Sequence, residues 1–254
     1  MARILSLHAH PDDAEILAGG TLALLAARGH ALTIATMTPG DCGSAELPPD
    51  EISAVRRGEA AAAAALLRAA YVCVELRDLA IFNDDPTRRR VVEVLRRARP
   101  GLILTSAPSD YHCDHEAASA LVRDACFAAP APNYDTRSPD PAPPLPAIPH
   151  LYFMDPIEGQ DRDGRDVAPD FLVDVSSVFQ RKRDLLACHA SQRDWLRHHH
   201  GFDDYLLRME HWTAQRGRLA GAPFAEGFRQ YRGHPYPTSP LLQELLADHL
   251  CQMS

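Results

Sequence analysis

Short apolar segments alternate with longer amphipathic segments along the first half of the chain. Four apolar runs have the length of buried strands: residues 4–7, 31–37, 71–76 and 102–105. The segments between and after them have helical composition or spacing: residues 14–28, 51–70, 87–99 and 115–128. Because strands and helices alternate, we predict an α/β fold of Rossmann-like, doubly wound type, with a mainly parallel sheet and helices on both faces.

The second half of the chain has a weaker pattern. Residues 151–154 and 171–175 are expected to form further strands, and residues 177–189 a helix. From about residue 193 we predict a helical C-terminal extension, in which Tyr205, Trp212 and Phe228 serve as packing groups. We expect residues 1–254 to form a single domain.

Residues 130–149 are rich in proline and poor in apolar side chains. Such a segment cannot form a sheet ladder or bury a core, so it is predicted to be a surface excursion. Two interpretations are open. In an enzyme, a long loop of this kind often forms a wall of the substrate site, and a disordered insertion has the same composition.

Composition narrows the classes of protein. The chain has 254 residues, 46% of them hydrophobic and 24% charged, and its formal net charge is −8. This balance is unfavourable for non-specific binding of nucleic acid, which depends on neutralising phosphates. No apolar run has the roughly 18 residues of a membrane span. The apolar N-terminal run is also too short for a secretory signal, so a cytoplasmic location is expected.

Two clusters of acidic and histidine residues directly follow predicted strands. One is His8-Ala9-His10-Pro11-Asp12-Asp13 after the first strand, and the other is Asp110-Tyr111-His112-Cys113-Asp114-His115 after the fourth. In a doubly wound sheet these two strands are central neighbours, and ligands bind at their carboxyl ends. We therefore expect the two clusters to face each other. A single His-Pro-Asp turn would by itself be read as a turn with a helix cap.

The residue types in the clusters point to a catalytic zinc site. Imidazole and carboxylate bind Zn²⁺, and His10, Asp13 and His115 can supply the three protein ligands of an open site. Asp12 can stand beside the bound water as a general base. His112 is placed to polarise the scissile carbonyl and protonate the leaving amine. Asp114 can orient one of the histidines.

The same residues resemble the LmbE/PIG-L family of zinc-dependent N-deacetylases. The resemblance rests on His10-Pro11-Asp12-Asp13-Ala14-Glu15 followed by Gly19-Gly20, and on His112-x-Asp114-His115. It extends over roughly residues 3 to 192, with Cys113 where the family usually has proline.

The family pattern implies removal of the N-acetyl group from an N-acetylglucosamine-type sugar conjugate. It implies one Zn²⁺ per chain, or another divalent metal, held by His10, Asp13 and His115. The catalytic roles implied are those of a general base for Asp12, of an oxyanion and leaving-group partner for His112, and of a charge-relay carboxylate for Asp114. The resemblance also implies substrate contact for Arg56 and is compatible with a homo-oligomer.

Two other functions fit parts of the pattern. A sugar-binding module that has lost turnover would retain the clusters, and a metallophosphoesterase also uses acidic and histidine side chains at a sheet edge. Two ions per chain would favour the phosphoesterase. The tract His198-His199-His200 is interpreted as a solvated helix end, because adjacent histidines on a helix do not converge on one ion.

Overall fold

The structure, a computed structural model, describes residues 1–193 and 205–251. Its centre is an eight-stranded sheet with the order β3-β2-β1-β4-β5-β7-β6-β8. The first five strands are mutually parallel where they pair, which confirms the predicted arrangement of the N-terminal half. Their bounds are β1 (Arg3–His8), β2 (Ala31–Thr36), β3 (Ala70–Cys73), β4 (Leu102–Thr105) and β5 (His150–Met154).

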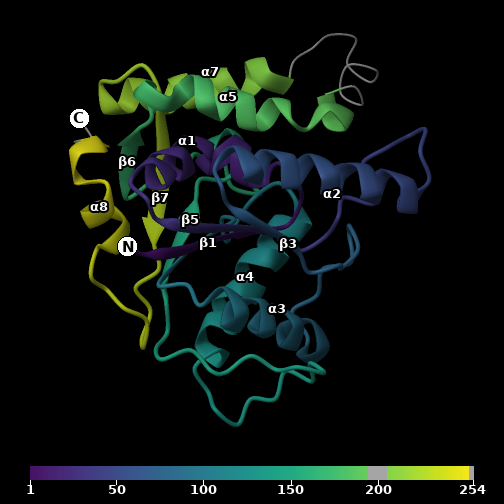
Figure 1. The fold of residues 1–254 in the computed structure, drawn as a ribbon. Coiled ribbons are helices and arrows are strands. Elements are labelled where there is room, and N and C mark those ends of the chain that lie inside the picture. Colours follow the sequence, from purple (N-terminus) through teal and green to yellow (C-terminus); the bar gives the residue numbers. More distant parts are fainter. Residues whose placement is uncertain (194–204, 252–254) are drawn as a thin grey trace.

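Helices cover both faces of the sheet, as the strand–helix alternation predicts (Figure 1). The helices after the first four strands are α1 (Asp13–Ala27), α2 (Pro49–Leu66), α3 (Asp85–Ala98) and α4 (Cys113–Ala128). Successive residues of β1 divide between two apolar cores: Ile4 packs on the side of α1, whereas Leu5 and Leu7 pack on the side of α3 and α4. Apolar side chains on both faces of β1 therefore account for a sheet with a layer of helices on each side.

Local signals in the sequence have the expected roles. Gly29, with φ of 76°, follows the end of α1 and allows the left-handed turn there. The Asp84 side chain accepts a hydrogen bond from the Thr87 backbone N–H at 2.9 Å and thus caps α3.

The C-terminal part departs from the prediction. Its elements are β6 (Phe171–Asp174), α5 (Phe179–Ala187), α7 (Tyr205–Ala220), β7 (Ala225–Gln230), α8 (Leu241–Leu245) and β8 (Leu250–Cys251). The expected all-helical extension is wrong, because β7 runs antiparallel between β5 and β6 inside the sheet. Its sequence, AEGFRQ, has only one large apolar side chain, Phe228, so the strand is set by pairing rather than by pattern. The tract His198-His199-His200 lies outside the described residues.

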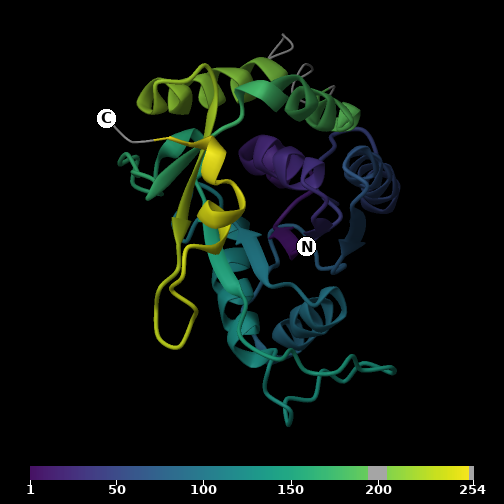
Figure 2. The ribbon, with the colours of Figure 1, turned by 60° about the vertical axis from the view of Figure 1, so that its left-hand side comes forward.

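The proline-rich segment, residues 130–149, forms an extended excursion beside α3 and α4, at the end of the molecule opposite α5 and α7 (Figure 2). Thr136 and Ala142 hydrogen-bond the Glu93 carboxylate on α3, which fastens the segment to that helix. Within residues 1–193 and 205–251, every helix is too short or too polar to cross a membrane.

Candidate metal and active site

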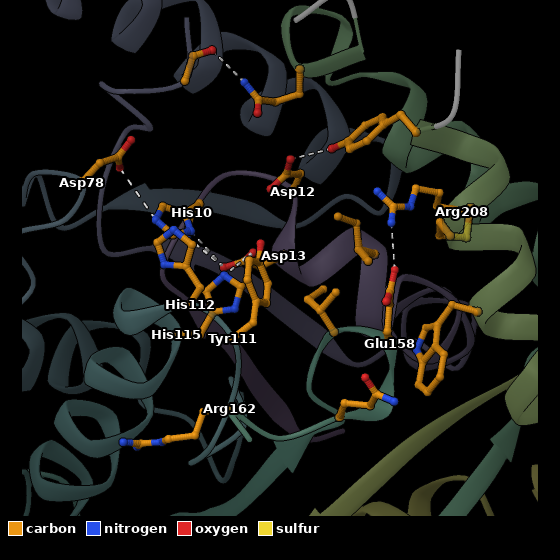
Figure 3. Close-up of a pocket in the computed structure, with 18 of the residues that line it drawn as sticks. His10, Asp12, Asp13, Asp78, Tyr111, His112, His115, Glu158, Arg162 and Arg208 are labelled. Atoms are coloured by element: carbon orange, nitrogen blue, oxygen red, sulfur yellow. Dashed lines mark hydrogen bonds and ion pairs between the residues drawn. The ribbon is translucent and has the colours of Figure 1, made fainter. Parts of the chain in front are cut away.

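The two predicted clusters meet at the carboxyl ends of β1 and β4. These strands pair in parallel, with Leu7 opposite Thr105, so the loops that follow them leave the same edge side by side. Each loop leads into a helix: α1 begins at Asp13 and α4 begins at Cys113. Figure 3 shows the imidazoles of His10, His112 and His115 grouped beside the Asp13 carboxylate. The expected convergence of the clusters is thus present in the fold.

Three histidines and one carboxylate form the centre of the site. Donor nitrogens of His10, His112 and His115 lie within 4.8 Å of one another. The Asp13 carboxylate lies between two of these rings: its Oδ2 is 3.8 Å from His10 Nδ1, and its Oδ1 is 3.3 Å from His115 Nε2. Nitrogen and oxygen donors of this type suit Zn²⁺, so the residues present fit the predicted metal.

Two further carboxylates contact His10 and His115, each at the ring nitrogen that does not face Asp13. Asp114 Oδ2 is 3.1 Å from His10 Nε2, and Asp110 Oδ1 is 3.0 Å from His115 Nδ1. Histidines that ligate metals commonly have such a partner on the other ring nitrogen, which fixes the tautomer and the ring orientation. Asp114 therefore contacts His10 through its side chain. The sequence reasoning gave Asp110 no role, although it stands five residues before His115, within the same cluster.

Burial and mutual charge shift the titration of these groups. Burial raises the pKa of the Asp13 carboxyl, but the charge and hydrogen bond of His115, together with the charges of His10 and His8, outweigh it and hold the pKa below its ordinary value. For His115, burial lowers the pKa, while Asp13 and Asp110 raise it more strongly, to well above the ordinary value. The lowered pKa keeps the Asp13 carboxyl in the ionised form that metal ligation requires.

Asp12 lies beside this centre in an unusual backbone conformation. Its φ is 101°, in the left-handed region that a residue with a side chain seldom adopts. The Tyr205 hydroxyl donates a hydrogen bond to Asp12 Oδ2 at 2.5 Å. Burial raises the pKa of the Asp12 carboxyl above its ordinary value, and the charge of Arg56 offsets this only in part. For His112, burial and the charges of His10 and His115 lower the pKa.

Arg56 reaches the same place from α2. Its Nη2 donates to the Pro11 carbonyl at 2.8 Å and lies 3.7 Å from Asp12 Oδ2. Gly40 and Gly43 make room for the guanidinium, because a Cβ at either position would lie within 2.4 Å of Arg56 Nη1. Arg56 thus lines the cavity, as its predicted contact with substrate requires, and also supports the turn that carries Asp12.

The centre opens into a cavity of about 880 Å³. The outer wall comes from the loop after β5 and from α7, where Glu158 and Arg208 form an ion pair of 2.9 Å (Figure 3). The wall residues are Ile157, Glu158, Gln160, Asp161, Arg162, Gly164, Tyr205, Arg208, Met209 and Trp212. None of the lining residues in the described part of the chain belongs to residues 130–149, so the proline-rich segment is not a wall of this cavity.

Two aromatic residues that we predicted to be packing groups also line the cavity. Tyr205 and Trp212 are on α7 and contribute to the outer wall, whereas Phe228 is fully buried in the core as expected. Trp212 packs against Gly159, where an added Cβ would lie 2.2 Å from the indole, and under the Arg216 guanidinium. The helical spacing of Tyr205 and Trp212 is compatible both with packing in the core and with lining a cavity. The sequence therefore gave no sign that they line the cavity.

Comparisons with known proteins place these residues in a family. Residues 5–126 match the family model PIG-L, described as GlcNAc-PI de-N-acetylase. The chain contains a PIG-L family domain. All seven site residues predicted from sequence lie within the PIG-L match: His10, Asp12, Asp13, Arg56, His112, Asp114 and His115. The outer wall, from Ile157 to Gly164 and on α7, lies outside it.

Proteins similar to this chain are named for different activities. The chain is 29% identical over 196 residues to a 4-oxalmesaconate hydratase of Pseudomonas putida. That match covers 74% of this chain and 73% of the hydratase. It is 26% identical over 243 residues to a diacetylchitobiose deacetylase of Thermococcus kodakarensis. That match covers 89% of this chain and 82% of the deacetylase. The crystal structure of 4-carboxy-2-hydroxymuconate hydratase from Pseudomonas putida has a TM-score of 0.74 and 26% identity, covering 94% of this chain and 99% of that one.

Proposed function

We propose that this protein is a zinc-dependent N-deacetylase acting on a small N-acetylglucosamine-type sugar conjugate. The observation that carries the proposal is the group of His10, Asp13 and His115 with the Asp12 carboxylate beside it, within a PIG-L domain. Relatives named as deacetylases of acetylated sugars, such as the one from Thermococcus kodakarensis, support this choice.

We propose that His10, Asp13 and His115 hold one Zn²⁺ per chain, with other divalent metals as substitutes. Asp114 and Asp110 would keep the two imidazoles in the orientation that ligation needs. When bound, zinc supplies a Lewis acid that polarises a carbonyl oxygen and makes a neighbouring water more acidic.

The chain's own groups account for the proton transfers. Asp12 accepts a proton as water adds to the acetyl carbonyl carbon. The C–N bond then breaks, and His112 donates a proton to the departing nitrogen, so the products are acetate and the free amine. His112 also faces the carbonyl oxygen, and Asp114 acts through His10. Arg56 is proposed to contact the sugar.

The outer wall would receive the remainder of the conjugate. Glu158 and Asp161 are balanced there by Arg162 and Arg208, so this half of the cavity has no net formal charge. Together with the indole of Trp212, such a surface offers hydrogen bonds and an apolar face, which suits a polyhydroxylated ligand.

Hydration of an unsaturated carboxylic acid is a second candidate function. It is favoured by the two comparisons with hydratases of Pseudomonas putida, one in sequence over most of the chain and one in fold. In that reaction Asp12 would again take a proton from water, but the oxygen would add to one carbon of a carbon–carbon double bond. The other carbon would take up a proton, and no amine would form.

The test is product analysis with the zinc-loaded protein. A panel of N-acetylglucosamine conjugates is assayed for free amine and acetate, and 4-oxalmesaconate is assayed for loss of its conjugated absorbance. We expect equal amounts of amine and acetate, loss of activity on chelation, and recovery on adding zinc. Hydration without amine release would replace the first proposal by the second. Binding of a conjugate without either reaction would favour a sugar-binding module that has lost turnover. Two metal ions per chain would favour a metallophosphoesterase.

The carboxylate behind His115 provides a separate test of the metal site. Asp110→Asn keeps the shape of the side chain and removes its charge, so we expect zinc affinity to fall about 10- to 100-fold. The measurement is competition with a chromophoric chelator. Asp124→Asn on α4, whose carboxylate contacts Asn83 and Arg123 at the surface, serves as the control for the same chemical change and is expected to bind zinc as wild type does. Equal affinity in both variants would contradict the assignment.

A further inference from the structure

The hydrogen bond between Tyr205 and Asp12 joins two distant parts of the chain. Tyr205 is the first described residue of α7, and it stands 193 positions after Asp12. It lies outside the segment that matches the PIG-L family. The tyrosine is 7% exposed, and its hydroxyl reaches the Asp12 carboxylate at 2.5 Å. The bond is therefore short, charge-assisted and largely shielded from water.

The two oxygens of Asp12 have different surroundings. Both Tyr205 and Arg56 approach Oδ2, at 2.5 Å and 3.7 Å. Oδ1 accepts no hydrogen bond from the described residues, although Asp12 lines the cavity. One oxygen is thus held by the protein, and the other is left for a molecule in the cavity.

The main chain of Asp12 is held on both sides. The Pro11 carbonyl accepts from Arg56 Nη2 at 2.8 Å, and the Asp12 carbonyl accepts from the Ile16 N–H at 2.9 Å. With the backbone fixed in its left-handed conformation, the remaining freedom is rotation of the carboxylate about the side-chain bonds. Among the described residues, the Tyr205 hydroxyl is the group that makes a hydrogen bond to this carboxylate and limits that rotation.

Tyr205 is itself firmly placed. Its ring belongs to a small apolar cluster with Phe179, Leu186 and Met209, which joins α5 to α7. Farther along α7, Arg216 Nε donates to the buried Asp155 carboxylate at 2.6 Å, and this ties the helix to the end of β5. The hydroxyl is thus presented from a packed element rather than from a loop.

From these contacts we infer that Tyr205 is a positioning residue, which holds Asp12 Oδ2 so that Oδ1 faces the attacking water. The inference rests on the proposed role of Asp12 as general base. It assigns α7 a part in the reaction in addition to forming the cavity wall. Orientation of a base within hydrogen-bond reach of its proton is a requirement for efficient transfer.

Tyr205→Phe tests the inference because it removes the hydroxyl and leaves the ring in its apolar cluster. We expect kcat to fall about 10- to 100-fold, with KM changed by less than about twofold and zinc content unchanged. Tyr152→Phe is the matched control: it removes a buried hydroxyl that bonds Gln243 at 2.9 Å in the core, and its kcat is expected to stay at the wild-type value. A kcat for Tyr205→Phe equal to that of wild type would overturn the inference.

A crystallographic comparison makes the test independent of the reaction. In wild type we expect a single orientation of the Asp12 carboxylate, and in Tyr205→Phe more than one. An unchanged single orientation in the variant would contradict the positioning role. If the wild-type enzyme releases no amine, the deacetylase proposal fails, whereas the two crystal structures still decide whether Tyr205 holds Asp12.

Discussion

Replacing Asp12 by asparagine is expected to lower kcat for deacetylation about 10²- to 10⁴-fold, the usual contribution of a general base. The amide has nearly the same shape as the carboxylate and its oxygen can still accept the Tyr205 hydrogen bond. It cannot take a proton from water. Because the proposed ligands are His10, Asp13 and His115, the variant should still bind one zinc ion per chain.

Steady-state release of amine, with the zinc content of the same samples, measures this effect. Asp124→Asn supplies the same carboxylate-to-amide change on the surface of α4 and is expected to leave kcat unaltered. Equal rates for Asp12→Asn and wild type would reject Asp12 as the base. A simultaneous loss of zinc would instead show that Asp12 belongs to the ligand set.

The largest effect on stability is expected at the buried ion pair that links α1, α5 and β7. Lys182 is fully buried, and its ammonium donates to Glu226 Oε1 at 2.5 Å and to the Ile16 carbonyl at 2.7 Å. The Glu226 carboxylate also accepts from the backbone N–H groups of Gly20 and Thr21, at 2.8 and 2.7 Å. Lys182 and Glu226 thus hydrogen-bond the backbone in the middle of α1, the helix that begins with Asp13.

Lys182→Met retains the aliphatic stem and leaves the Glu226 carboxylate buried without its counter-ion. We expect the free energy of unfolding to fall by about 3–5 kcal/mol, since that is the usual result of breaking a buried pair. Urea denaturation followed by circular dichroism measures it. Adding Glu226→Gln to the variant should restore part of the loss, because the amide oxygen is neutral and can still accept a backbone N–H.

Arg183→Met, at the next position of α5, is the matched control. Its ion pair with Glu210 has a short distance of 2.6 Å, but both side chains are about one-third exposed. Solvent screens such a pair, so the expected loss is below about 1 kcal/mol. If both variants lose equal stability, burial of Lys182 is not the source of the effect.

The meeting of the two clusters of acidic and histidine residues was largely predictable, because it depends on local order and on one topological rule. His10 and Asp13 are three residues apart on the turn into α1, and His112 and His115 are three apart at the start of α4. Parallel pairing of β1 with β4 then brings the turns to one edge of the sheet. Asp110 was missed because a carboxylate near a strand end has several uses, and its bond to His115 appears only once the loop is folded.

Among these features, the sequence by itself determined the alternation of strands and helices, the adjacency of the first and fourth strands, and the meeting of the two clusters of acidic and histidine residues. These depend on periodicity and on short-range spacing, which a single chain displays directly. Only the tertiary structure decided that β7 enters the sheet, that α7 and the loop after β5 form the cavity wall, and that Tyr205 bonds Asp12. Those contacts join residues far apart in the chain, and their partners are selected by packing, which leaves no periodic trace in the sequence.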